Sequence, residues 1–277
     1  MTTKEPFACL RNQGLVVANS YKKASGAYVE PDQVFRKGGA FYELGTSEPV
    51  EQLLEKMGKS KLNGVSPDEI IEEFGADSLR LYEMFMSPFD REKVWKTEAL
   101  LGVYRFLCRA YDMCTSEKVS ETSSKGADRL IGRLILGVAA DLERMQFNTA
   151  IAKMMEFINA FTPLEHYPVS ALLAFVQVLY PFAPHLSSEL WKQLGGEGAI
   201  EDKDLPTVDP KRLEESSVPY IVQVNGRHRG TFKLAKDLSE DNLKAIVIED
   251  PSISKHLEGT IAKVIFVPNR LINFVVK

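Results

Sequence analysis

A short basic loop holds the residues of this chain whose types and spacing best suit phosphate chemistry. It consists of Lys56, Met57, Gly58, Lys59 and Ser60. Two lysines three residues apart, with a glycine between them, make a cationic arm that can close over a polyphosphate. Such an arm balances the negative charge that develops when pyrophosphate leaves. The alternative is a solvated connector, since short Lys, Gly and Ser segments commonly join structural elements.

A second pair of cations lies near the C-terminal end. Arg227 and Arg229 alternate beside Asn225-Gly226, and alternate residues of a strand share one face. Two guanidinium groups on one face can reach one phosphate track, although a solvated strand edge is the alternative. Residues 218–277 carry nine Lys or Arg against six Asp or Glu, whereas the preceding residues carry 25 against 32. A basic C-terminal region on an acidic body suits a phosphate contact confined to one surface.

Composition narrows the class of protein. A length of 277 residues fits two domains, and 44% hydrophobic with 26% charged residues is typical of soluble globular proteins. The longest apolar stretch, Ala171 to Leu186, contains Pro181 and Pro184, which favours a buried helix over a membrane span. The N-terminus has no apolar signal core. The three cysteines are odd in number and lack metal-ligand spacing, so we predict no metal site and a reducing, cytoplasmic location.

The first 64 residues read as short strands and turns. Gly14 to Ala18 and Phe41 to Leu44 are predicted strands around a polar loop at 20–27. Pro49 to Glu55 is predicted to be a short helix that leads into the basic loop.

The middle of the chain is predicted to be an antiparallel helical bundle. Ser66, Pro67 and Glu69 read as a capping box that begins a short helix, which Gly75 ends. Further helices are predicted over 77–86, 97–113, 125–145 and 148–161, the last with Asn148 as its cap, and one or two more are predicted within 169–194. Two apolar stripes at spacings of three and four are assigned to the core. They are Leu100, Leu101, Tyr104, Leu107, Cys108 and Tyr111, then Leu130, Leu134, Ile135, Val138 and Leu142.

After a predicted linker at 196–217 the hydrophobic period changes to two. Asn225-Gly226 between two alternating runs predicts a hairpin with a type I′ turn. Ser239 is expected to cap a helix to about Glu249. A second strand pair is predicted over 261–267 and 271–276, so residues 218–277 should form a small α+β module of ββαββ order.

Taken in order, these residues resemble the class I aminoacyl-tRNA synthetases. The basic loop is similar to their KMSKS signature, with Gly58 where a serine is usual, and Asn12-Gln13-Gly14 resembles the last part of their catalytic domain. Phe74 to Arg80 resembles the start of their helical anticodon-binding domain. Tyr180 to Trp191 is similar to a stretch of the Leu/Ile/Val group, and Val222 to Gly230 resembles the terminal domain of bacterial leucyl members.

The resemblance implies a mainly α fold with three parts. Residues 1–64 would be a remnant of the α/β catalytic domain, 65–195 the helical anticodon-binding domain, and 218–277 a tRNA-binding α+β domain after the 196–217 linker. None of the four histidines lies in a HIGH-type motif, which the family places far upstream of the basic loop. We therefore expect the C-terminal portion of a leucyl-type enzyme.

The implied reaction has two steps. Leucine attacks ATP, with Mg²⁺, to give an adenylate and pyrophosphate, and a ribose hydroxyl of tRNA(Leu) then attacks the activated carbonyl. By resemblance Lys59 contacts the ATP phosphates in the transition state, Lys56 assists or orders the loop, and Arg227 and Arg229 contact tRNA. Gly58 would remove a hydroxyl donor and add backbone freedom. The expected protein is a monomer that does not bind membranes.

Two alternatives stay open on the sequence. The chain could be a stand-alone tRNA-binding module without catalysis, or it could belong to a valyl- or isoleucyl-type relative. The predicted ββαββ module argues against the second.

Overall fold

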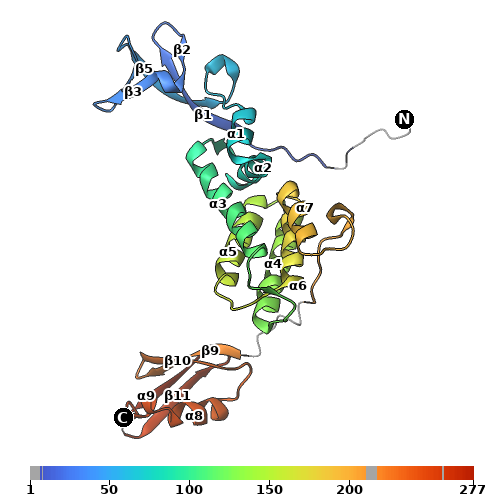
Figure 1. The fold of residues 1–277 in the computed structure, drawn as a ribbon. Helices are drawn as coiled ribbons and strands as arrows, with labels where there is room; N and C mark the ends of the chain where they lie inside the picture. Colours follow the sequence, from blue (N-terminus) through green and yellow to red (C-terminus); the bar gives the residue numbers. More distant parts are fainter. Residues whose placement is uncertain (1–6, 8, 210–216, 258) are drawn as a thin grey trace. The chain divides into compact units, whose positions relative to one another are not determined.

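A computed structural model describes residues 7, 9–209, 217–257 and 259–277 of the chain. The chain divides into two compact units, Met1–Pro210 and Lys211–Lys277 (Figure 1), and each is described by itself. Within the expected catalytic remnant, residues 1–6 and 8 lie outside the described residues.

The first unit begins with a small, mainly antiparallel sheet. Its strands are β1 (Val16–Lys23), β2 (Tyr28–Val29), β3 (Val34–Lys37), β4 (Ala40–Glu43), β5 (Pro49–Lys56) and β6 (Lys93–Val94). The order is β2-β1-β5-β4-β3, and β6 pairs in parallel with the start of β1. The 3₁₀ turn η1 (Pro31–Gln33) precedes β3.

Two of our predictions in this sheet are wrong. The segment predicted as a helix before the basic loop is strand β5, which pairs with β1 from Val17 opposite Lys56 to Lys23 opposite Val50. This non-local pairing overrides the local pattern, and Pro49 is the first strand residue, a position that proline tolerates. Strand β1 also continues to Lys23, through part of the predicted loop.

The described part of the first unit contains seven α-helices within the segments predicted to be helical. They are α1 (Pro67–Phe74), α2 (Ala76–Phe85), α3 (Thr97–Cys114), α4 (Lys125–Glu143), α5 (Phe147–Phe161), α6 (Val169–Leu179) and α7 (Pro184–Gln193). They share one buried hydrophobic cluster that runs from Ile70 to Ile200. Two short strands, β7 (Val119–Ser120) and β8 (Tyr167–Pro168), pair in parallel at the bundle. Gly75 ends α1 with a φ of 83°, as the sequence predicts.

Details of capping and of the α3 core differ from prediction. Ser66 is the N-cap of α1, but its side chain makes no capping hydrogen bond with the described residues. Helix α5 begins at Phe147, so Asn148 is not its cap. On α3, Leu101, Tyr104 and Tyr111 are exposed. The buried face comprises Leu100, Val103, Phe106, Leu107, Ala110, Met113 and Cys114. Because α3 carries apolar residues on more than one face, its packing against α2, α5 and α7 decides which face is buried.

Part of the predicted linker belongs to the bundle. The 3₁₀ turn η3 (Ile200–Asp202) buries Ile200 in the helical core. The indole Nε1 of Trp191 donates to the carbonyl of Gly198 at 3.0 Å. Residues 210–216 of that linker lie outside the described residues.

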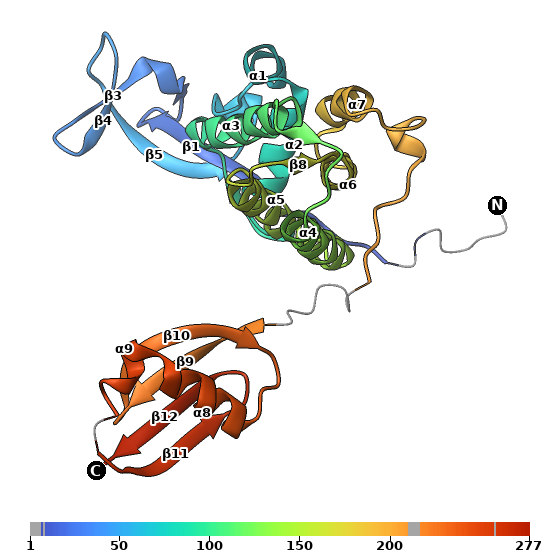
Figure 2. The same ribbon diagram turned by 60° about the horizontal axis from the view of Figure 1, so that its bottom comes forward.

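The second unit is the predicted ββαββ module with one extra short helix. It contains β9 (Ser217–Val224), β10 (Arg227–Ala235), α8 (Glu240–Glu249), α9 (Pro251–Ser254), β11 (Ile261–Val267) and β12 (Leu271–Val276). The strand order is β10-β9-β12-β11, and α8 and α9 pack on one face of the sheet (Figure 2). Asn225 and Gly226 have φ values of 51° and 77°, as a type I′ turn requires, and the Ser239 side chain caps α8.

Candidate functional site

The basic loop starts at the last residue of β5. The Met57 N–H donates to the carbonyl of Val16 at 3.1 Å, so the loop leaves the sheet beside β1. Residues Lys59–Lys61 form the 3₁₀ turn η2, which ends at Leu62 with a φ of 53°. The loop is therefore a compact turn next to the sheet.

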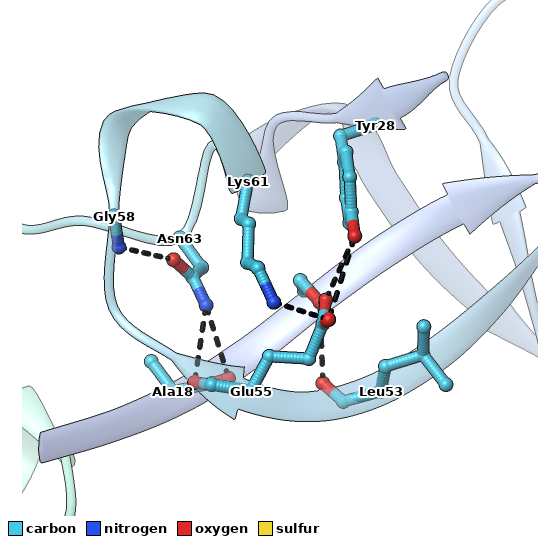
Figure 3. Close-up of polar contacts among 8 residues, drawn as sticks. Ala18, Tyr28, Leu53, Glu55, Gly58, Lys61 and Asn63 are labelled. Atoms are coloured by element: carbon cyan, nitrogen blue, oxygen red, sulfur yellow. Dashed lines mark hydrogen bonds and ion pairs between the residues drawn. The ribbon is translucent and has the colours of Figure 1, made fainter. Parts of the chain in front are cut away.

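Asn63 fastens this turn to two strands (Figure 3). It is buried, and its Oδ1 accepts a hydrogen bond from the Gly58 N–H at 3.0 Å. Its Nδ2 donates to the carbonyls of Ala18 at 3.2 Å and Glu55 at 3.4 Å. One amide thus joins the loop to β1 and β5.

Glu55 makes the second fastening. Its carboxylate forms an ion pair with Lys61, and it accepts hydrogen bonds from Ser20 Oγ at 2.6 Å and the Tyr28 hydroxyl at 3.1 Å (Figure 3). The hydrogen bond from Lys61, followed by that from Ser20, lowers the pKa of Glu55 from 4.5 to about 2. Lys61 is therefore occupied by a carboxylate.

Lys56 and Lys59 differ from Lys61 in this respect. Both are exposed, and neither side chain makes a hydrogen bond or ion pair with the residues that the structure describes. The network around Asn63 and Glu55 thus holds the loop in place while it leaves two ammonium groups available for an anionic ligand. Ser60 is exposed in the same turn.

Gly58 does not use the backbone freedom that we expected. Its φ is −175° with a ψ of 148°, which is extended backbone that any residue adopts. A Cβ built at this position would meet no heavy atom within 4 Å. A serine would fit here.

The arginine pair of the second unit is arranged differently from prediction. The register of β10 against β9 shifts between His228 and Gly230, so Arg229 has no cross-strand partner. This irregularity breaks the alternation that was expected to bring Arg227 and Arg229 to one face. Arg227 is exposed, whereas Arg229 is half-buried, and its Nε is buried with no hydrogen-bond partner among the described residues.

Two of the segments that carry the family resemblance meet in the bundle. Asp77 of α2 is buried and accepts a hydrogen bond from His185 Nδ1 and one from the Leu186 N–H, both at 2.8 Å. The carboxylate therefore binds the first turn of α7, where it complements the helix dipole. No role was predicted for Asn63, Glu55 or Asp77, although Asp77 lies within one of the recognised motifs and Glu55 and Asn63 flank another.

Among the described residues, no group of three or more His, Cys, Asp or Glu side chains could hold a metal ion. Among the described helices, none combines the length and the apolar character of a membrane span. Cys9, Cys108 and Cys114 are free thiols, and burial raises the pKa of Cys114 to about 12.

Part of the chain matches a known family of domains. Residues 127–246 match the family described as the anticodon-binding domain of tRNA ligase. The match begins in α4 of the bundle and ends in α8 of the second unit. This region is thus related to tRNA ligases.

Similar proteins with known names indicate which type of tRNA ligase the chain resembles. The chain is 49% identical to the leucine–tRNA ligase of Protochlamydia amoebophila and 44% identical to that of Chlamydia caviae, over 99% of this chain and 33% of each relative. A solved structure, the ternary complex of Agrobacterium radiobacter K84 LeuRS with tRNA and LeuAMS, matches with 25% identity and a TM-score of 0.66. That match covers 99% of this chain and 34% of the solved one. Over nearly its whole length the chain is similar to leucine–tRNA ligases, and it spans about one third of the length of these relatives.

Proposed function

We propose that this chain is the C-terminal portion of a leucine–tRNA ligase that activates leucine with ATP and transfers it to tRNA(Leu). The sequence similarity to leucine–tRNA ligases over 99% of this chain supports the proposal. The names of those relatives favour it over a valyl- or isoleucyl-type enzyme. In the proposal, residues 1–64 complete the catalytic domain, and the bundle and second unit bind tRNA.

The observation that supports the proposal most directly is that the lysines of the basic loop differ in whether a carboxylate pairs with them. Lys61 is neutralised by Glu55, whereas Lys56 and Lys59 are exposed and have no partner among the described side chains. When the leucine carboxylate attacks the α-phosphorus, negative charge grows on the departing pyrophosphate. Lys59 would stabilise that charge in the transition state, and Lys56 would assist it. ATP would carry its Mg²⁺ on the phosphates, since Mg²⁺ commonly binds through substrate phosphates.

The proposed tRNA contacts lie in the second unit. Arg227 is exposed next to the hairpin turn and can reach a phosphate directly. Arg229 has a half-buried side chain, so it would contribute through its guanidinium end. Contacts of this kind position a nucleic acid and carry no base sequence information.

A chimera tests the proposal. The matching third of the Protochlamydia amoebophila ligase is replaced by this chain, and leucine-dependent pyrophosphate exchange and leucylation of tRNA(Leu) are measured. We expect both activities in the chimera and neither in the isolated chain, whose sequence lacks a HIGH motif. If a folded chimera fails in both steps while the isolated chain binds tRNA(Leu), the stand-alone binding module is the better explanation.

A further inference from the structure

Lys93 is a buried cation that the proposed reaction does not use. Its relative exposure is 8%, and it lies on β6, where its N–H donates to the carbonyl of Leu15. Its ammonium Nζ donates to the carbonyl of Glu83 at 3.1 Å, in the last turn of α2. No carboxylate of the described residues pairs with Lys93.

One role of Lys93 is therefore structural, because a cation at a helix C-terminus complements the exposed carbonyls. That role uses one of its donors, whereas an ammonium group has three. A buried ammonium with a single hydrogen bond and no counter-charge lacks much of the compensation that burial of a charge requires.

Lys93 also lies in the wall of a cavity. It lines a cavity of about 810 Å³ together with Gln13, Lys56, Met57, Glu83 and Phe147. Lys56 pairs with Val17 on one side of β1, and Lys93 pairs with Val16 on the other. Their backbones are thus two strand spacings apart, about 10 Å. The cavity therefore joins the basic loop to the buried lysine.

We propose that this cavity is a phosphate subsite, with the Lys93 ammonium as its buried contact and Lys56 at its border. The residues that line the cavity include two lysines and one acidic residue, Glu83, so the net charge of the lining favours an anion. This inference rests on the proposed function for its ligand, since both ATP and the tRNA backbone carry phosphate. Lys93 is then a binding residue in addition to Lys56 and Lys59.

The experiment measures the binding of inorganic tripolyphosphate to the 277-residue chain by titration calorimetry. Lys93→Met keeps the length of the side chain and removes the charge, and we expect it to weaken binding at least tenfold. Lys93→Arg should retain binding within about threefold, because a guanidinium keeps both the charge and the contact to the Glu83 carbonyl. Lys37→Met, at an exposed lysine of the same sheet, should change nothing. Equal binding by the wild type and Lys93→Met would overturn the subsite.

A second variant keeps the test informative if Lys93→Met fails to fold. Glu83→Gln removes the negative charge of the cavity and leaves the carbonyl that Lys93 contacts. It should tighten tripolyphosphate binding severalfold, and unchanged or weaker binding counts against the subsite. Competition distinguishes the sources of phosphate: displacement by ATP assigns the subsite to the nucleotide, and displacement by a single-stranded RNA ending in CCA assigns it to tRNA.

The two proposals fail separately. If tripolyphosphate binding does not depend on Lys93 but the chimera is active, the subsite is wrong and the ligase function stands. If binding depends on Lys93 but the chimera is inactive, the cavity is a phosphate site and the ligase proposal fails.

Discussion

The basic loop and the β9–β10 hairpin, which carries Arg227 and Arg229, present their cationic side chains in two different ways. In the loop, side-chain contacts fix the turn: Asn63 and Glu55 tie it to β1 and β5, and among the described residues Lys61 alone of its lysines pairs with a carboxylate. In the hairpin, the strand ladder positions the arginines, and a register shift at Arg229 interrupts the regular alternation after Arg227. Cationic side chains near strand ends therefore differ in how easily a ligand can reach them, because the contacts that fix the surrounding backbone differ. The loop is built to keep two cations free, whereas the hairpin frees one and half-buries the other.

The largest expected effect tests the free cations of the loop. In the chimera, Lys59→Ala should lower the rate of leucine activation by about 10²–10³, the size seen when one transition-state donor is removed. Leucine affinity should hardly change, because the lysine meets phosphate. Lys56→Ala should cost less, and Lys37→Ala should cost nothing. Pyrophosphate exchange measures this, and a loss under threefold for Lys59→Ala would make it a bystander.

Removing the fastening of the loop should have the next largest effect. Asn63→Ala deletes three hydrogen bonds of a buried amide, and we expect the first unit to lose about 2–3 kcal/mol of unfolding free energy. Denaturant unfolding measures the loss. Leucine activation in the chimera should fall as well, because Lys56 and Lys59 lose their fixed frame. A stable variant with full activity would show that the amide network does not position the loop.

The hairpin is tested by replacing both arginines. Arg227→Ala with Arg229→Ala should weaken tRNA binding by roughly 1–3 kcal/mol and flatten its salt dependence by about one to two units of slope. The register shift sharpens this expectation: Arg227→Ala alone should produce most of the binding loss, whereas Arg229→Ala should also lower thermal stability because its stem is half-buried. Leucine activation should survive. Filter binding over a series of salt concentrations measures both quantities. Unchanged tRNA affinity and an unchanged salt slope in the double variant would contradict the proposed contact.

The ion pair of the loop predicts a pH dependence. The pKa of Glu55 is lowered from 4.5 to about 2, so its contribution to stability is present above pH 4.5 and is lost as the pH falls toward 2. Lys61→Met removes the largest cause of the shift and should raise the pKa of Glu55 toward its ordinary value. An NMR titration of the carboxyl groups measures this. A Glu55 pKa that stays low in the variant would assign the shift to Ser20 and Tyr28 instead.

The smallest effect is expected at Gly58. Gly58→Ser should change the stability of the first unit by no more than about 0.5 kcal/mol, because the backbone is extended and the space is open. Thermal unfolding of the variant checks this. A large destabilisation would mean that the loop samples a conformation that only glycine adopts.

Local patterns determined most of the secondary structure. The helices of the bundle follow a 3.6-residue period, Gly75 ends α1, and Asn225-Gly226 makes the predicted type I′ turn. The second unit was predictable almost strand for strand, because hairpin turns and caps are decided by neighbours in sequence. The family resemblance could also be recognised from the sequence, because it depends on the order and residue types of the motifs.

The site itself depended on contacts between distant residues. Strand β5 exists because it pairs with β1, more than 25 residues away in sequence, and its local pattern suggested a helix. Asn63 reaches Ala18, Asp77 reaches His185, and the burial of Lys93 depends on β6 joining β1. The sequence by itself determined which residues could do chemistry and which helices and turns could form. Only the tertiary structure decided which lysines are free, paired or buried, because that depends on partners that pairing and packing bring together.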